Sequence, residues 1–289
     1  MGRDLMPLAL PPGKRLAVSI GADFDAHCLW MGTFGVSTPT YLSRGEFGAE
    51  VGVPRLLELF ARHSIRTTWC TPAHTLQTFP QQCASIADAG HEIAAHGCYH
   101  EQVPKLDPAE ERRLLTLQIA EHERLTGRRP TGYRSPAWDF SDATLGLLEE
   151  FGFVWDSSLM GRDFQPYHPR PVVNVDRERG NTFGDPSPIL EIPVSWFLDD
   201  FPALELQPRG GVMGSTETLY QRWKDHLDFA YERVPNGVFT LTVHPQTIGR
   251  AHAFLMLERF LDYAIGHDDV WFAPLSDIAA TWSDDAHSA

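Results

Sequence analysis

Two carboxylates separated by one residue stand where the first apolar run of the chain ends. The run from Leu16 to Ile20 is followed by Gly-Ala-Asp23-Phe-Asp25. If the strand pleat continues past this run, both carboxylates point to one face and are close enough to share a site. The pattern is also typical of a loop in which aspartates only cap backbone groups, so the pair needs further support.

A second apolar run, His91 to Ala95, ends on His96, and His100 follows four residues later. On a helix or a tight turn, such a pair presents two imidazoles to one metal ion, and a carboxylate from elsewhere completes a three-ligand set with an open position. In a chain with 13 histidines the pair alone is a weak signal. A zincin motif fits less well, because His91 and His96 are five residues apart where H-E-x-x-H needs four.

The elements that must position these residues alternate between short strands and longer helices. Helix signals begin near Pro54, at the N-cap Asp107, and after Ser141. Strand and helix in repeated alternation imply parallel strands with right-handed crossovers. Apolar runs predict eight strands, over residues 16–20, 66–70, 91–95, 131–134, 153–156, 189–194, 238–243 and 270–273. The sequence therefore predicts an α/β fold in which residues 1–289 form one domain, a distorted (β/α) barrel of seven or eight mostly parallel strands.

Polar residues follow several of these strands at the same topological position. Arg134 closes the fourth predicted strand, Asp156 the fifth and His244 the seventh. In a β/α barrel the carboxyl ends of the strands converge on the face where active sites are built. We therefore expect one site that brings together Asp23, Asp25, His96, His100, Arg134, Asp156 and His244.

Two long segments interrupt the alternation of strands and helices. Residues 26–52 and 157–188 are rich in Gly, Pro and aromatic residues and lack periodicity. Loops of this length in a compact domain are usually functional, or they are ordered by a partner subunit. The sequence does not favour either explanation.

The net charge of the chain argues against two classes of binding partner. With 24 Lys and Arg against 38 Asp and Glu, the net charge of −14 argues against nucleic acid or an anionic membrane surface. Prolines break the apolar stretch near the N-terminus, and no run reaches the roughly 20 apolar residues that cross a bilayer. The four cysteines contain no C-x-x-C pair, so reduced thiols are expected. We therefore expect a cytoplasmic protein.

As a set, these motifs resemble the polysaccharide deacetylase superfamily, also called carbohydrate esterase family four. The resemblance runs in order from about Leu16 to Ala273. Most members have two adjacent aspartates in the first motif, whereas here one residue separates them. This split form is similar to a cytoplasmic branch that contains atypical peptidoglycan-deacetylase-like enzymes, cyclic imide hydrolases and a metal-independent allantoinase. The matching motifs are Asp23-Phe-Asp25, His96-Gly-Cys-Tyr-His100, Arg134-Ser-Pro-Ala-Trp138 and His244-Pro245, and the segments 191–200 and 244–250 also resemble this branch.

The resemblance implies a metal site. Asp25, His96 and His100 match the metal ligands of the family, and one carboxylate with two neutral imidazoles suits Zn²⁺. Co²⁺, Ni²⁺ and Mn²⁺ are accepted by the same ligand types. The allantoinase relatives work without metal, but all three ligand types are present here, which favours a metal enzyme with one divalent ion.

The resemblance also implies how protons move. Asp23 matches the general base that takes a proton from the metal-activated water. Arg134 matches the residue that tethers this aspartate and keeps it ionised, since a nearby cation favours the charged form. His244 matches the general acid that protonates the leaving nitrogen.

Further residues are expected around the reacting groups. A backbone N–H near Tyr99 is expected to stabilise the oxyanion. Trp138 and Trp196 are expected to line the pocket wall, although as aromatics they fit rim packing equally well. Asp156 or Asp199 is expected to orient the general acid, although each also fits an ordinary loop carboxylate.

Two enzymatic functions are consistent with these motifs. The split aspartates, the lack of an export signal and the aromatic site neighbours favour hydrolytic opening of a small cyclic imide or ureide, a carbon–nitrogen bond other than a peptide bond. The alternative is removal of an N-acetyl group from an amino sugar in an oligosaccharide or in peptidoglycan. A protein that had lost activity and kept the barrel would have a broken metal set or lack the base, and neither is seen. Because related cytoplasmic members form homo-oligomers, often tetramers, a homo-oligomer is expected.

Overall fold

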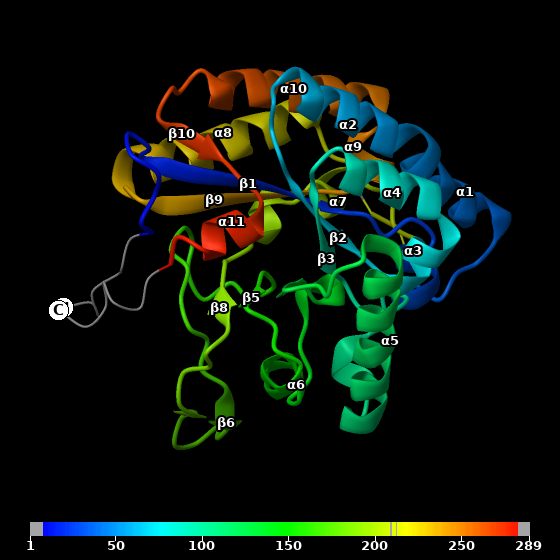
Figure 1. Ribbon diagram of the computed structural model, residues 1–289, viewed down its shortest axis with the longest axis vertical. Helices are drawn as coiled ribbons and strands as arrows, with labels where there is room; N and C mark the ends of the chain where they lie inside the picture. The colour runs from blue at the N-terminus through cyan, green and yellow to red at the C-terminus, as the bar shows by residue number, and fades with distance from the viewer. Residues whose placement is uncertain (1–7, 209, 212, 283–289) are drawn as a thin grey trace.

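A curled sheet of parallel strands forms the centre of the molecule (Figure 1). The computed structural model describes residues 8–208, 210–211 and 213–282. The strands of the sheet are β1 (Leu16–Asp23), β2 (Thr68–Thr71), β3 (Glu92–Ala95), β4 (Gly132–Tyr133), β5 (Trp155–Asp156), β8 (Leu190–Glu191), β9 (Gly237–Val243) and β10 (Val270–Phe272). Each lies at one of the predicted segments, so all eight strand predictions are confirmed, although most strands are shorter than expected.

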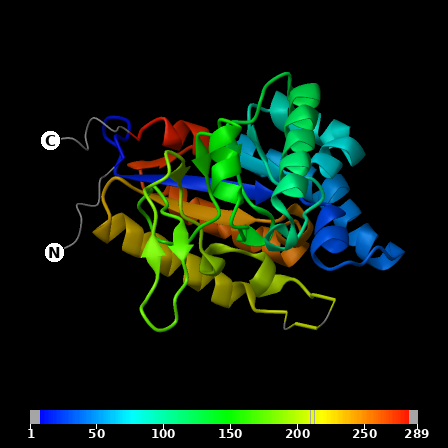
Figure 2. The same cartoon turned by 90° about the horizontal axis from the view of Figure 1, so that it is seen from below.

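Strand β1 runs through the middle of this sheet beside β9 (Figure 2). Along its other edge β10 pairs with Leu16–Val18 and β2 pairs with Gly21–Asp23. From β2 the parallel order continues through β3, β4 and β5 to β8. Beyond β8, one bridge joins Asp199 to Thr242 of β9. The sheet therefore curls toward closure, and the predicted distorted (β/α) barrel is confirmed.

Helices cover the sheet on two sides (Figure 1). Their bounds are α1 (Pro39–Phe47), α2 (Val53–Arg62), α3 (Ala73–Thr78), α4 (Pro80–Asp88), α5 (Pro108–Thr126), α6 (Thr144–Glu150), α7 (Phe201–Leu204), α8 (Thr216–Arg233), α9 (Pro245–Ile248), α10 (Ala251–Ile265) and α11 (Leu275–Ala279). The longest shows why the helix signals could be read from sequence. Asp107 accepts hydrogen bonds from the N–H groups of Ala109 and Glu110, and Gly127 ends α5 at φ +69°.

Side chains alternate along β1 between two environments. Leu16, Val18 and Ile20 belong to the main hydrophobic core, which includes residues of α2, α8 and α10. Gly21 lies on the interior face of the barrel, where a Cβ atom would come 2.5 Å from the Arg134 guanidinium. Because side chains two residues apart in a strand share a face, β1 also presents Asp23 to the interior.

The two segments without periodicity have different structures. Residues 26–52 form the short helix η1 (Leu29–Thr33), α1 and η2 (Gly48–Gly52), so the expectation of an irregular loop is wrong there. Residues 157–188 are largely irregular and include a hairpin of β6 (Val172–Asn174) and β7 (Thr182–Phe183), which projects from the body (Figure 1). Whereas η1 and η2 are π-helical, η3 (Val103–Lys105), η4 (Pro136–Trp138) and η5 (Trp196–Leu198) are 3-10 turns.

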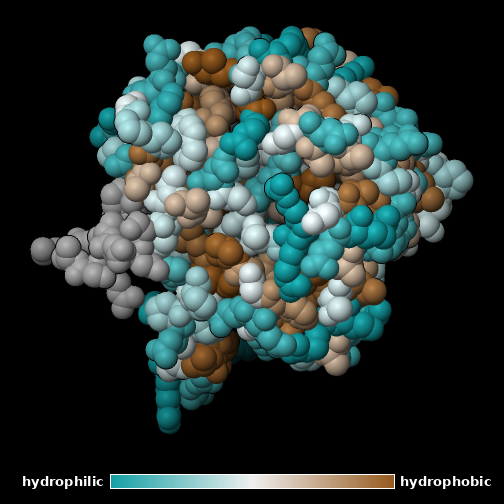
Figure 3. Space-filling view, viewed as in Figure 1, coloured by the Kyte–Doolittle hydropathy of each residue, from teal (hydrophilic) through white to brown (hydrophobic). Residues whose placement is uncertain are grey.

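The surface seen in Figure 3 is mixed, with hydrophilic residues over most of the face and small hydrophobic patches between them. Within the described part of the chain, no helix combines the length and the apolar character needed to cross a bilayer. Cys28, Cys70, Cys83 and Cys98 are free thiols.

Candidate active site

The two aspartates of the first motif share one buried site. Asp23 is the last residue of β1, and Asp25 follows two residues later. His96 Nε2 lies 3.3 Å from Asp25 Oδ1 and 3.9 Å from Asp23 Oδ2. Arg134 Nη1 donates a hydrogen bond of 2.7 Å to Asp23 Oδ1. The structure thus brings the first, second and third sequence motifs to one end of the barrel.

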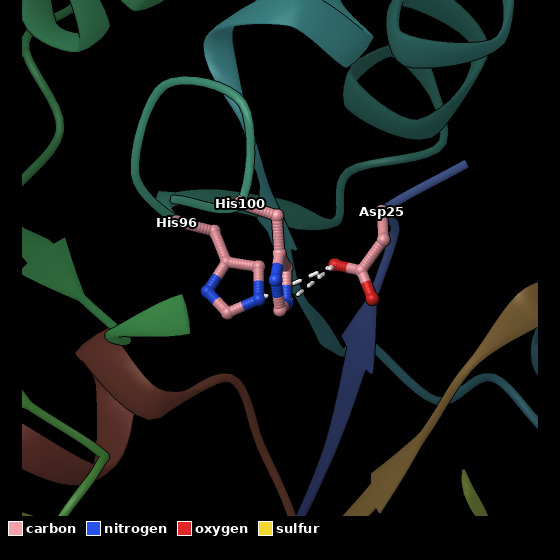
Figure 4. A group of neighbouring side chains, drawn as sticks. All are labelled: Asp25, His96 and His100. Atoms are coloured by element: carbon pink, nitrogen blue, oxygen red, sulfur yellow. Dashed lines mark ion pairs between the residues drawn. The ribbon is translucent and has the colours of Figure 1, made fainter. Parts of the chain in front are cut away.

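The two histidines of the second motif sit on a tight loop after β3. Gly97 and His100 both adopt left-handed backbone, at φ +68° and +60°. A Cβ atom at Gly97 would come 2.6 Å from Pro136 and 2.9 Å from Glu101, so glycine is needed at this bend. The bend turns both imidazoles toward the Asp25 carboxylate (Figure 4), and His100 Nε2 lies 3.8 Å from Asp25 Oδ1.

Each of these imidazoles is oriented through its other nitrogen. His96 Nδ1 lies 2.7 Å from the Arg134 carbonyl oxygen, and His100 Nδ1 lies 2.5 Å from Thr33 Oγ1. A carbonyl can only accept, so His96 carries its proton on Nδ1 and leaves the Nε2 lone pair for a ligand role. Thr33 belongs to η1, in the first aperiodic segment, and sequence patterns contain no signal for its contact with His100.

The three residues fit a divalent metal ion. Both carboxylate oxygens of Asp25 and the Nε2 atom of His96 are buried without a hydrogen-bond partner. Unsatisfied buried polar atoms are costly, and converging ones are typical of a cation site. The candidate ligand atoms of Asp25, His96 and His100 lie within 4.8 Å of one another. Burial outweighs the attraction of Asp25 and lowers the pKa of His100 to about 4, which keeps this imidazole in the neutral form that binds metals.

His244 lies on the opposite side of Asp25, immediately after β9. Its Nε2 atom is 3.8 Å from Asp25 Oδ2, and its Nδ1 atom is 2.8 Å from Asp200 Oδ1 and 3.4 Å from Asp199 Oδ1. Burial alone would lower the pKa of His244, but these carboxylates together raise it well above the usual value. The carboxylates therefore favour the protonated form of His244, which can donate a proton.

The orienting carboxylate differs from the sequence prediction. Asp200 accepts hydrogen bonds from both the backbone N–H and the Nδ1–H of His244. Asp199 lies beside it and accepts from the N–H of Phe201, and burial raises the pKa of Asp199 to about 8. Asp156 does not take this role, because its Oδ1 atom accepts from Ser158 near Arg134 instead. The adjacent pair Asp199–Asp200 was the available sequence signal, and one of its two members was overlooked.

The expected oxyanion donor is also wrong. The N–H of Tyr99 donates to Glu101 at 2.8 Å, and the N–H of Cys98 donates to the same carboxylate. These backbone groups are already satisfied by Glu101, so the amide of Tyr99 is not free to bind a substrate oxygen. The carboxylate instead holds the loop between the two histidines in shape.

The two tryptophans stack on each other beside Arg134. The ring centroids of Trp138 and Trp196 are 4.2 Å apart, with 26° between the planes. The Arg134 guanidinium carbon lies 5.9 Å from the Trp138 ring. Trp138 is buried, whereas Trp196 is 42% exposed, so the stack leads from the site to solvent. Ala137 and Trp138 both have positive φ, at 53° and 54°, a strained backbone that is commonly found at functional sites.

A pocket of about 500 Å³ opens beside the histidine loop. Its lining includes Thr33, Gln102, Lys105, Ala137, Asp139 and Gln207. Gln102 Nε2 donates to the Thr33 carbonyl oxygen, which connects this pocket to the residue that contacts His100. The pocket therefore lies next to the candidate metal site and extends the space around it.

Comparisons with known proteins agree with this geometry. Residues 46–155 match the family model described as Polysaccharide deacetylase. The chain is 35% identical to the peptidoglycan deacetylase of Helicobacter pylori, over 92% of this chain and 96% of that protein. It is 36% identical to a peptidoglycan deacetylase-like protein of Gibberella zeae, over 89% of this chain and 83% of the relative. The crystal structure of Puue allantoinase is similar with a TM-score of 0.80 at 25% identity, covering 100% of this chain and 99% of the allantoinase.

Proposed function

Since the chain belongs to the polysaccharide deacetylase family, we propose that it is a metal-dependent hydrolase that removes an N-acetyl group from an amino sugar of a glycan. The observation that carries this proposal is the buried Asp25 carboxylate, which has two imidazoles on one side and His244 on the other. The comparisons favour this function over the ring opening of cyclic amides that the sequence motifs suggested, because the relatives that match along most of the chain are named for peptidoglycan deacetylation.

The role of the metal is to activate the carbonyl group and the attacking water. When bound by Asp25, His96 and His100, a divalent cation such as Zn²⁺ polarises the acetamide carbonyl and makes water more acidic. The chain's own residues supply the proton transfers and the orientation of the groups.

Asp23 acts as the general base. Its Oδ1 atom is occupied by Arg134, and its Oδ2 atom faces the metal side of the site, 3.9 Å from His96 Nε2. Arg134 is itself fixed, because its Nε and Nη2 atoms donate to the carbonyl and hydroxyl oxygens of Ser157. The base is therefore held in one orientation and takes the proton of the attacking water through Oδ2.

His244 acts as the general acid. Its Nε2–H faces the reacting centre, while Asp200 accepts the Nδ1–H and holds the ring in place. As the amide nitrogen takes this proton, the carbon–nitrogen bond breaks, and acetate and a free amine are released. The proton collected by Asp23 then returns to solvent, and His244 takes a proton back from solvent, which together restore the starting charges.

The adjoining pocket supports a substrate larger than a small ring. It offers amide side chains from Gln102 and Gln207 and one ammonium group from Lys105. Amide groups donate and accept hydrogen bonds, as sugar hydroxyls and acetamides do. A neighbouring sugar unit therefore finds both space and polar partners there.

Ring opening of a small cyclic amide is a second candidate for a specific reason. The candidate metal ligands are nearly inaccessible, with 0% exposure for Asp25 and 3% for His100. A small planar substrate reaches such a site more easily than a polymer does. The match to an allantoinase over the whole chain supports the same candidate. Both functions use the same attack on a carbonyl, and they differ in whether acetate is released.

One assay separates the two functions. Purified protein is incubated with N-acetylglucosamine oligomers or peptidoglycan, and separately with succinimide, hydantoin and allantoin, each with and without a chelator. The proposal expects chelator-sensitive release of acetate from the acetylated substrates. Ring opening without acetate release would establish the second candidate instead. Activity that survives complete metal removal would contradict the metal-dependent mechanism.

We further propose that the chain forms a homo-oligomer. The projecting hairpin β6–β7 exposes Val173 and Phe183, and an isolated two-stranded hairpin is only marginally stable in water. Contact with a second copy would bury these side chains. Light scattering of the purified protein measures the mass, and a monomer at micromolar concentration would contradict this expectation.

A further inference from the structure

A pair of carboxyl groups lies inside the barrel and takes no part in the mechanism above. Asp156 of β5 and Glu191 of β8 are register partners on adjacent parallel strands. Both side chains are completely buried. Two buried carboxylates at neighbouring positions repel each other, so their contacts need an explanation.

Half of the oxygens of this pair are well satisfied. Glu191 Oε1 accepts hydrogen bonds from the N–H groups of Ser158 at 3.0 Å and Leu159 at 2.9 Å. Asp156 Oδ1 accepts from the Ser158 hydroxyl at 2.8 Å. The same hydroxyl oxygen accepts from the N–H of Ser135, the residue that follows Arg134. The pair therefore holds the segment that begins at Ser157.

The other two oxygens have no donor. Asp156 Oδ2 and Glu191 Oε2 are buried and without a hydrogen-bond partner. The two carboxyl groups lie within hydrogen-bonding reach of each other, so one shared proton supplies the missing donor and removes one of the two buried negative charges. We propose that Asp156 and Glu191 share one proton, so that the pair carries a single negative charge and positions Arg134.

The proton resides on Glu191. Burial raises the pKa of Glu191 well above its usual value, and the neighbouring Asp156 raises it further. Burial also raises the pKa of Asp156, but the hydrogen bond from Glu191, the Ser158 hydroxyl and the Arg134 guanidinium all act in the opposite direction. Glu191 is therefore the donor and Asp156 the acceptor.

Ser157 connects the carboxyl pair to Arg134. The pair anchors Ser158 and Leu159, and Ser157 accepts from Arg134 at both its carbonyl oxygen, 2.9 Å, and its hydroxyl, 3.0 Å. Arg134 in turn presents Nη1 to Asp23. Asp156 and Glu191 are thus positioning residues for the general base. This consequence rests on the proposed function, whereas the shared proton does not.

Infrared difference spectroscopy at neutral pH tests the shared proton directly. An un-ionised carboxylic acid absorbs at higher frequency than an ionised carboxylate. Replacing Glu191→Gln is expected to remove a carboxylic-acid band from the spectrum of the whole protein, whereas Asp156→Asn is expected to remove a carboxylate band. The matched control is Glu150→Gln, an exposed carboxylate in an ion pair with Arg112, which is expected to remove a carboxylate band. If Glu191→Gln removes a carboxylate band instead of a carboxylic-acid band, Glu191 is ionised in the wild-type protein and the proposal is overturned.

Kinetics test the positioning role. In Glu191→Gln, the amide oxygen can accept from Ser158 and Leu159 while the amide N–H donates to Asp156, so kcat is expected to stay near the wild-type value. Glu191→Leu can neither accept hydrogen bonds from Ser158 and Leu159 nor donate one to Asp156. It is expected to lower kcat about tenfold, with KM unchanged. Equal losses in both variants, at unchanged melting temperature, would overturn the positioning role. If the wild-type protein does not deacetylate amino sugars, the proposed function fails, and the infrared result still decides the shared proton.

Discussion

Two clusters of the active site have nearly the same composition and different tasks. We call them the metal cluster, Asp25, His96 and His100, and the acid cluster, Asp199, Asp200 and His244. In each cluster the candidate ligand atoms lie within 4.8 Å of one another. The metal cluster leaves the Asp25 oxygens and His96 Nε2 without hydrogen bonds, whereas in the acid cluster Asp200 accepts two from His244. Composition alone therefore does not distinguish a cation site from a proton donor, but hydrogen bonding does.

His100 of the metal cluster and His244 of the acid cluster differ in the direction of their pKa shifts. His100 and His244 each have Nε2 3.8 Å from an oxygen of Asp25. Burial lowers the pKa of His100 to about 4, while the carboxylates of the acid cluster overcome burial and raise the pKa of His244. The same side chain thus has its pKa shifted in opposite directions at the two positions, because Asp199 and Asp200 lie beside His244 only.

The largest expected effect comes from removing the carboxylate of the metal cluster. Asp25→Ala leaves two imidazoles, too few to hold a divalent ion tightly, so kcat/KM is expected to fall by on the order of 10³ or more. Bound zinc, measured by elemental analysis after dialysis, is expected to fall together with activity. Full zinc occupancy in this variant would remove Asp25 from the ligand set.

Replacing the base separates metal binding from proton transfer. Asp23→Asn keeps the size of the side chain but cannot accept a proton, so kcat is expected to fall by roughly 10² to 10⁴. The zinc content is expected to match the wild type, because Asp23 is held by Arg134 outside the metal cluster. Full turnover in Asp23→Asn would show that another group is the base.

The acid cluster is expected to respond unequally to its two aspartates. Asp200→Asn removes the charge that bonds His244, so kcat is expected to fall about 10²-fold. The alkaline limb of the pH–rate profile is expected to move to lower pH, because losing a carboxylate lowers the pKa of the acid. Asp199→Asn is the matched comparison. Asp199 lies farther from His244 Nδ1 than Asp200 does, at 3.4 Å against 2.8 Å, and accepts a hydrogen bond from the N–H of Phe201 instead, so its replacement by Asn is expected to have a smaller effect on kcat. Equal shifts in the two variants would contradict this assignment.

The smallest expected effect concerns the support of one metal ligand. Thr33→Val removes the oxygen that meets His100 Nδ1, and zinc affinity is expected to fall about tenfold. Thr33→Ser keeps a hydroxyl and is expected to bind zinc as the wild type does. Competition with a chromophoric chelator measures both affinities. A valine variant with unchanged affinity would show that the metal cluster does not depend on this contact.

Predictions from sequence succeeded where residue type and position along a strand were enough. Asp23 and Asp25 were located because an apolar run ends on them, and strand periodicity put both near one face. Predictions failed where a side chain depends on a segment between strands. The expectation of Asp156 or Asp199 instead of Asp200 is an example, because the path of residues 192–200 back toward β9 determines which carboxylate bonds His244.

The Tyr99 amide and the Thr33 hydroxyl are two further groups whose contacts depend on loop structure and were not predicted from the sequence. The Tyr99 amide donates to Glu101, and the Thr33 hydroxyl contacts His100 Nδ1. Both contacts depend on loop dihedral angles that apolar periodicity does not encode. The first aperiodic segment also folds into short helices against the site, while the second extends a hairpin outward. The second segment contains five prolines and the first only one, and proline disfavours helix, so composition accounts for part of this difference.

The amino-acid sequence alone determined where the strands lie, that they are parallel, and that polar residues follow their carboxyl ends. It also determined which residue types can hold a metal and move protons. Tertiary structure decided which carboxylate faces which histidine, which amide groups are already bonded, and which imidazole is charged. The reason is physical: hydrophobic periodicity acts over a few residues along the chain, whereas pKa values and hydrogen bonds depend on groups that only folding brings within a few ångströms.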